Sequence, residues 1–472
     1  MITKTKEIIK LPIFRALIKL SIPIILANLF QAMYQMTDSF WVGRLGGAAL
    51  ASVAICSPII FLSFAIGIGF AIAGATFVAQ YFGAKNNQMV SHSAAQTILM
   101  IFITSLIIST LGFIFAPNIL HLMGANSEIF NTALGFLRFS FLAVIFNFSF
   151  FIFQAIMRGI GRPQIPVFIV VGTVLLNFIL DPLFIFGYKF IPGLGVQGAV
   201  IATIITQSLA AIIGFSILFG GKHGIHLKIK DFIPDFKFIK KAFLIGIPSS
   251  IEQSSRNLTM VFMTSIIASF GTTAIASYGA GSNIIQVAMF IGIGLAVANG
   301  TLVGQNIGAQ KIDQAVKVSK LSAVISFISL SILGLIAFIF AKSLVTFFIP
   351  NDPLVIATGA QFIRFISLTF GFIGLQMSFG NVFMAAGQTK TTMFLTISSQ
   401  WLIQIPLAFF LSQKTSLGLT GVWFAIPFTN IFVSSIAFLL YKKGNWKKSD
   451  LIERNKVVGQ VSKEVIVEEG IH

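Results

Sequence analysis

Long apolar runs separated by short polar connections recur along the whole chain. Most of these runs have the length that an α-helix needs to cross ~30 Å of hydrocarbon, roughly 20 residues. The pattern is typical of an all-α polytopic membrane protein. It predicts twelve transmembrane helices, at residues 16–42, 48–80, 93–116, 130–156, 165–187, 195–219, 242–268, 279–306, 317–347, 361–384, 392–413 and 419–442.

The second half of the chain repeats the first. When residues 20–84 are shifted forward by 225 positions, 20 of the 65 pairs are identical. Each repeat holds six predicted spans, so both repeats enter the membrane from the same side. Parallel repeats of this kind are related by a pseudo-two-fold axis along the membrane normal, and the cleft between them is the natural substrate path. We therefore expect an N-terminal lobe, a linker, a C-terminal lobe and a tail, at 1–219, 220–241, 242–442 and 443–472.

Composition and charge placement sharpen this interpretation. Hydrophobic residues make up 56% of the chain and charged residues 10%, which excludes a string of soluble domains. The net charge of +18 would suit a nucleic-acid binder. However, 25 of the 32 Lys and Arg residues lie in the N-terminus, the connections after even-numbered spans and the C-terminus. This is the positive-inside pattern. We expect a multi-pass protein of the cell (inner) membrane with cytoplasmic termini, linker and tail, and no nucleic-acid partner.

Other kinds of chemistry have little support in the chain. The single Cys56 excludes an intramolecular disulfide, and five His with one Cys supply no metal-ligand set. Gly67 and Gly69 lie inside an apolar span without the Gly-Lys-Ser/Thr of a phosphate loop, so they favour close helix packing. We find no nucleophile–base pair. We therefore expect a protein that is not an enzyme, has no cofactor and is driven by an ion gradient.

Three acidic residues lie inside predicted spans: Asp38, Asp181 and Glu252. A carboxylate at the bilayer centre costs roughly 2.5–3.5 kcal/mol on insertion scales, which favours a functional use. Asn177 precedes Asp181 by four residues, so both lie on one helical face. Asp38 and Asp181 with this carboxamide would suit a hard cation, and two neighbouring carboxylates would also suit proton exchange. The alternative is that each Asp merely faces water at the end of its span.

Glu252 is followed by Arg256 at the i, i+4 spacing of a helical ion pair. One interpretation is a self-compensating pair inside the seventh span. The other is that Glu252 lines the central cavity and meets a cationic substrate or ion. Pro23 and Pro248 hold equivalent places in the two repeats, where each interrupts helical hydrogen bonding. Their equivalence favours an architectural role, with a gating hinge as the alternative.

Several segments, in this order, resemble the multidrug and toxic compound extrusion (MATE) family. They are Pro23 and the stretches MTDSFWVGRLG (36–46), QYFGA (80–84), MRGIGR (157–162) and NFILDP (177–182). The resemblance covers about 10–442. It implies an inner-membrane antiporter with two six-helix lobes around a central cleft. Such proteins exchange Na+ or H+ for lipophilic, usually cationic, small molecules.

Within the family, the chain resembles the DinF-like branch, which uses an Asp in span 1, an Asn and an Asp in span 5 and a Thr in span 6. The resemblance implies a cation- or proton-coupling site at Asp38, Asn177 and Asp181, with Thr203 as the fourth member. The resemblance also implies that these four residues could serve as ligands of Na+.

The NorM-like branch carries acids in spans 7 and 10. Glu252 resembles the first of them, but residues 361–384 contain no acid. The resemblance therefore favours coupling in the N-terminal lobe and leaves Glu252 and Arg256 as candidates for the substrate cleft.

A lipid or lipid-linked oligosaccharide flippase of the same superfamily is the alternative function. It would need a cavity rich in Arg for an anionic pyrophosphate. Arg138, Arg256 and Arg364 are the arginines inside predicted spans. We expect a monomer surrounded by membrane lipids.

Overall fold

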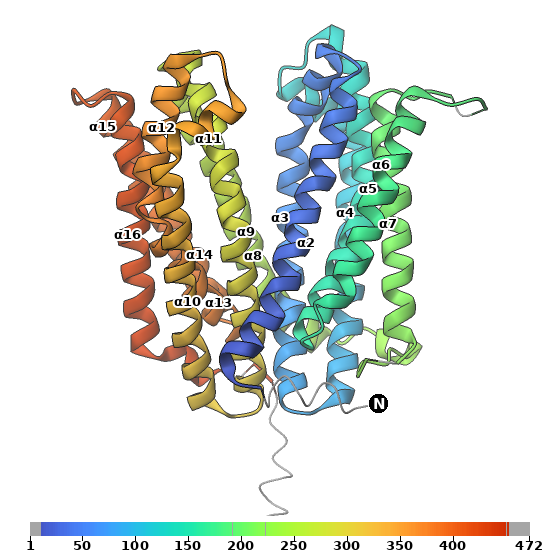
Figure 1. Ribbon diagram of the computed structural model, residues 1–472. Coiled ribbons are helices and arrows are strands. Elements are labelled where there is room, and N and C mark those ends of the chain that lie inside the picture. The colour runs from blue at the N-terminus through green and yellow to red at the C-terminus, as the bar shows by residue number, and fades with distance from the viewer. Residues whose placement is uncertain (1–10, 191, 222, 450, 453–472) are drawn as a thin grey trace, which may run out of the picture.

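The computed structural model describes residues 11–190, 192–221, 223–449 and 451–452. These residues form helices and connecting loops without a β-strand, as predicted (Figure 1). The first half contains α2 (Ile13–Gly43), α3 (Gly47–Gly83), α4 (Asn87–Leu122), α5 (Ser127–Gly159), α6 (Gln164–Phe186) and α7 (Val196–Phe219). The second half contains α8 (Phe236–Ala268), α9 (Thr272–Gly308), α10 (Ile312–Ile339), α11 (Ala341–Phe348), α12 (Pro353–Ser367), α13 (Phe370–Ala385), α14 (Thr389–Ile397), η2 (Ser398–Gln404), α15 (Ile405–Gln413) and α16 (Leu419–Lys443).

Each predicted span has a helical counterpart. Within the described residues, ten helices are long and apolar enough to cross a membrane, and the bent pair α12/α13 makes eleven. The remaining predicted span is α8, whose 33 residues are long enough to cross but include Glu252 and Arg256. The chain is therefore a multi-pass membrane protein.

The tenth span is broken rather than straight. Helices α12 and α13 meet at an angle of 49°. At the break, the hydroxyls of Ser367 and Thr369 donate to the backbone carbonyls of Arg364 and Ile366. Such local side-chain bonds compete with the helical ladder, which accounts for a bend without an internal proline.

The eleventh span is continuous but contains a π-helical segment, η2, between α14 and α15. Pro406 lies in the first turn of α15. A proline cannot donate the usual backbone hydrogen bond, and a local π adjustment allows the freed carbonyl to be satisfied within a membrane helix.

The helices form two bundles, which we name by chain order: the first bundle is α2–α7 and the second is α8–α16 (Figure 1). We call the side on which α2 begins the N-terminal face, and the opposite side the distal face. The bundles lie close together near the N-terminal face in Figure 1. Successive spans alternate in direction, so α3, α5, α9 and α13 all end at the N-terminal face.

The first helix of each half begins in the core of the other half. The hydrophobic cluster built on α9, α10 and α13 includes Leu17 and Leu20 from the start of α2. The cluster of the first bundle includes Ala242 and Ile245 from the start of α8. These pairs are related by the 225-residue repeat, so the exchange is symmetric.

Further along, both helices return to their own bundles. Tyr34 of α2 packs in the core of the first bundle, and Met263 of α8 packs in the core of the second. Pro23 and Pro248 lie in the stretches where the two helices change partners. The lobe boundaries at 219 and 242 come from the sequence repeat. Because α2 and α8 each pack in both bundles, these positions stay a prediction as domain boundaries.

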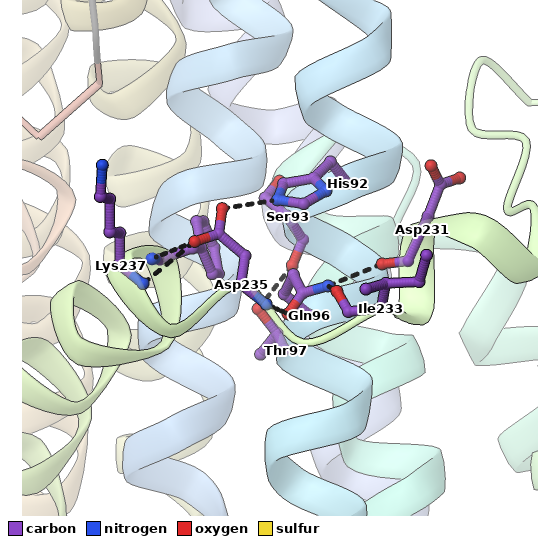
Figure 2. A network of polar contacts seen from close by, with 9 residues as sticks. His92, Ser93, Gln96, Thr97, Asp231, Ile233, Asp235 and Lys237 are labelled. Atoms are coloured by element: carbon purple, nitrogen blue, oxygen red, sulfur yellow. Dashed lines mark hydrogen bonds and ion pairs between the residues drawn. The ribbon is translucent and has the colours of Figure 1, made fainter.

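The connection between the halves is fastened to α4 (Figure 2). The buried Gln96 side chain donates to the backbone carbonyls of Asp231 and Ile233, both at 2.7 Å, and accepts from the amide of Asp235 at 2.9 Å. The Asp235 carboxylate caps α8 and lies 3.2 Å from Nε2 of His92. The backbone N–H of Phe238, with His92, holds the pKa of Asp235 below its usual range. Helix α8 consequently begins at Phe236, inside the stretch expected to be linker.

Candidate functional site

The two intramembrane aspartates of the first bundle lie together. Asp38 is near the distal end of α2, and Asp181 is near the distal end of α6, which packs against α2. The Asp38 carboxyl contacts the side chains of both Asp181 and Asn177. Asn177 Nδ2 donates to Asp181 Oδ1 at 3.0 Å, as their shared helical face predicts. Both α6 side chains are fully buried.

The cluster presents oxygen atoms that no donor satisfies. Asp38 Oδ1, Asn177 Oδ1 and Asp181 Oδ2 are buried and accept no hydrogen bond within the described chain. An unsatisfied buried acceptor costs about 1–3 kcal/mol, so three of them in one place call for a proton or a cation. Oxygen ligands suit hard cations. The described residues contain no group of three or more His, Cys, Asp or Glu that could hold a metal, so this site rests on two acids and an amide.

Tyr34 extends the cluster to α7. It lies one helical turn before Asp38, and its hydroxyl is 2.6 Å from Thr206 Oγ1. Thr203, expected as the fourth member, also interacts with this hydroxyl, as does Gln207. Thr203 therefore reaches the cluster through the Tyr34 hydroxyl. Sequence reasoning missed Tyr34 and Thr206, and the available signal was the four-residue spacing from Tyr34 to Asp38.

An aromatic cluster forms around Trp41, about one helical turn beyond Asp38 on α2. The Trp41 ring packs against two rings of α6, with centroid distances of 5.8 Å to Phe178 and 6.2 Å to Phe186. The Arg44 guanidinium lies 5.3 Å from the Trp41 ring. Apolar rings beside buried carboxyls lower the local dielectric, which strengthens the attraction between the carboxyls and a proton or cation.

Glu252 and Arg256 form the expected ion pair in the second bundle, away from the aspartates. Arg256 Nη2 donates to Glu252 Oε1 at 2.9 Å and to Thr396 Oγ1 at 3.1 Å. Glu252 is 1% exposed, whereas the Arg256 side chain is 40% exposed. The pair thus has one buried partner and one partner that reaches a surface.

The two bundles are joined near the N-terminal face by a symmetric pair of glutamines. Gln80 Nε2 at the end of α3 donates to the Ala385 carbonyl of α13 at 2.7 Å. Gln305 Nε2 at the end of α9 donates to the Gly159 carbonyl of α5 at 2.9 Å. Both glutamine side chains are buried. We call these two bonds the glutamine clasp.

Two glycines allow the backbones to approach at the glutamine clasp. A Cβ atom on Gly83 would lie 1.9 Å from the Gln305 carbonyl oxygen, and one on Gly308 would lie 1.8 Å from that of Gln80. The repeat relates Gly83 to Gly308 and Gln80 to Gln305, so the contact is formed twice. Only glycine permits so close a backbone contact.

Comparison with known proteins gives relatives of nearly the same length. "Probable multidrug resistance protein YoeA" of Bacillus subtilis is 25% identical, over 96% of this chain and 97% of the relative. "Probable multidrug resistance protein NorM" of Thermotoga maritima is 26% identical, over 94% and 95%. "Multidrug export protein MepA" of Staphylococcus haemolyticus is 27% identical, over 93% and 97%.

Solved structures share the fold. A multidrug resistance MATE family transporter of the MOP superfamily, in an outward-facing conformation, gives a TM-score of 0.87 at 22% identity, over 93% of this chain and 98% of that one. A MOP superfamily transporter from Pyrococcus furiosus gives the same values. The MatE family model matches residues 23–183 and 248–410, one copy in each half. The two matched copies, the symmetric bundles and the shared fold lead to one conclusion: this chain belongs to the MatE family.

Proposed function

We propose that this protein is a secondary active antiporter that exports lipophilic, mostly cationic drugs or toxic metabolites in exchange for H+ or Na+. The names of its relatives support drug export. The observation that carries the coupling is the set of three buried, unsatisfied oxygens on Asp38, Asn177 and Asp181. In the described part of the chain, this pair of carboxylates at membrane depth has no fixed positive charge beside it, so it is suited to bind a mobile cation or proton.

The coupling ion is a second substrate of the antiporter, and no other cofactor is proposed. A proton would reside on one of the two aspartates. Na+ would take oxygen ligands from Asp38, Asn177 and Asp181, with Thr203 as the fourth candidate and Tyr34 as a positioning group. In either case the ion reduces the negative charge of the pair, and with it the repulsion between the two carboxylates.

Helix α2 provides the route from the ion to the substrate path. Its distal half carries Asp38 in the first bundle, while its beginning packs in the core of the second bundle. A change at Asp38 therefore acts on a helix that both bundles hold. We propose Pro23 and Pro248 as the hinges of the two crossing helices, because each lies where its helix changes bundle. The ion can shift the equilibrium between conformations only as far as its affinities for them differ.

Orientation follows from the charges of the chain. The connections rich in Lys and Arg lie at the N-terminal face, which the positive-inside rule places in the cytoplasm. The protein would then be a multi-pass, monomeric protein of the cell (inner) membrane with both termini cytoplasmic. Because the glutamine clasp joins the bundles at that face, this orientation would make the conformation one that is closed toward the cytoplasm. Cytoplasmic closure supports an outward-facing state in an alternating-access cycle.

The test is ethidium transport in proteoliposomes with Na+ and pH gradients imposed separately. We expect one gradient to drive transport in the wild type. Asp38→Asn and Asp181→Asn should abolish the driven component while the protein stays folded, as judged by its elution from a sizing column. Glu128→Gln is the matched control, because Glu128 is an exposed acid on the distal face. Gradient-driven transport at the wild-type rate in either Asp variant would refute the coupling site.

A further inference from the structure

The ion pair of α8 joins a buried acid, Glu252, to a partly exposed base, Arg256. Glu252 Oε1 accepts from both Arg256 Nη2 and Thr396 Oγ1, at 2.9 and 3.2 Å. With only 1% of its surface exposed, Glu252 cannot also meet a substrate directly. The charged group that α8 presents outward is therefore the guanidinium of Arg256, and Glu252 fixes its position.

The position of Arg256 limits what it can face. It lies near the middle of α8, which places it deep in the membrane. A guanidinium at such depth costs roughly 2.5–3.5 kcal/mol against hydrocarbon, so intramembrane charges face the interior of a bundle or a water-filled cavity. The next residue, Asn257, donates to the Phe61 carbonyl of the first bundle at 3.3 Å. Arg256 thus precedes by one position on α8 a residue that contacts the other bundle, and we infer that its partly exposed guanidinium borders the proposed substrate path.

The π-helical segment η2 provides the support for this pair. In a π turn, residues five apart come onto one face, so Thr396 and Trp401 both reach α8. Trp401 Nε1 donates to Ser255 Oγ at 2.7 Å, and Gln400 Oε1 accepts from Thr259 Oγ1 at 3.1 Å. An ordinary α-helix would turn Trp401 away from Thr396. These bonds hold η2 against α8 at residues on both sides of Arg256.

The guanidinium keeps unused donors. It has five N–H groups, and within the described chain both of its hydrogen bonds come from Nη2. The hydrogens on Nε and Nη1 are left for an acceptor. A fixed, planar guanidinium matches a carboxylate in two parallel bonds, whereas it repels an organic cation.

We propose that Arg256 is a specificity-determining residue that binds the carboxylate of zwitterionic or anionic lipophilic substrates, with Glu252 and Thr396 as its positioning residues. This proposal rests on the export function proposed above and names a substrate class for it. A permanent cation without a carboxylate would pass without using Arg256. Drugs that carry a carboxylate should depend on it.

The experiment compares norfloxacin, which carries a carboxylate, with ethidium, a permanent cation. Binding to purified protein in detergent is measured by fluorescence anisotropy, and transport is measured in proteoliposomes. Arg256→Gln should weaken norfloxacin binding by about 10- to 100-fold, since hydrogen bonds to a charged group are lost, and should not weaken ethidium binding, because it removes a charge that repels a cation. Arg256→Lys keeps the charge but not the planar fork, and should give an intermediate loss. Arg364→Gln is the matched control, an exposed arginine within the tenth span.

The outcomes separate the two proposals. Norfloxacin binding that is absent in the wild type, unchanged in Arg256→Gln, or lost together with ethidium binding would overturn the role of Arg256. A selective loss of norfloxacin binding supports that role even if no gradient drives transport. Wild-type protein that binds both compounds and transports neither would overturn the export function alone.

Discussion

Replacing Gln305 by Met should weaken the conformation in which the two bundles touch. Methionine keeps the length of the side chain but cannot donate the 2.9 Å bond to the Gly159 carbonyl. A buried hydrogen bond contributes a net of about 1 kcal/mol. The bond joins different bundles, so it stabilises only the joined conformation. Its loss should lower the population of that conformation, relative to one with separated bundles, by about fivefold.

Gln80 should behave differently despite the symmetry. Its Nε2 donates to the Ala385 carbonyl at 2.7 Å, but its own Oε1 is buried without a donor. An unsatisfied buried acceptor costs about 1–3 kcal/mol, and Gln80→Met removes that cost together with the bond to Ala385 and a longer one, 3.4 Å, to Ser449 Oγ. We therefore expect a smaller shift than for Gln305→Met, or a shift of the opposite sign.

Distances between spin labels measure this shift. Labels at Gln88 on α4 and Lys390 on α14, both exposed, report the separation of the bundles at the N-terminal face. The buried Cys56 is replaced by Ala to avoid a third label. Gln305→Met should increase the fraction at long distance, while the exposed Gln286→Met on α9 should not. Identical distance distributions in wild type and Gln305→Met, at low and saturating ion, would refute the holding role of the glutamine clasp.

Two further predictions concern the coupling cluster and the start of α8. Tyr34→Phe removes the 2.6 Å hydrogen bond with Thr206, which contributes about 1 kcal/mol to positioning the cluster. The Na+ or H+ concentration for half-maximal transport should therefore rise severalfold. Tyr188→Phe, at an exposed position, should leave that concentration unchanged. Asp235→Ala should lower the unfolding free energy by about 1 kcal/mol through loss of the α8 cap, whereas Asp235→Asn keeps the cap and loses only the ionic attraction to His92. Because the native pKa of Asp235 is depressed, this carboxylate stabilises the fold near neutral pH, and its contribution should fade as the pH drops below about 4. A thermal-unfolding series that shows equal losses for both Asp235 variants would contradict the capping role.

The sequence alone determined the membrane class, the helical spans and the repeat. These follow from local properties: run length, charge placement and identity between halves. It also predicted that Asn177 and Asp181 lie on one helical face, because four residues make about one helical turn. Grouping Asp38 with them was a hypothesis from the acids of the first repeat, which the family resemblance supported, because the spacing by itself does not relate α2 to α6.

The tertiary structure decided which distant residues meet. The bond from Gln80 to Ala385 joins residues 305 positions apart, and Trp401 reaches Ser255 across 146 positions. Helix packing determines such partners, because a helical pattern shows which residues share a face but not which helix that face meets. The exchange of helix ends between bundles, the clasp at Gln305 and the exposed guanidinium of Arg256 depend on this packing. For that reason only the structure shows that the Glu252 side chain is buried and that the Arg256 guanidinium is the partly exposed member of the ion pair.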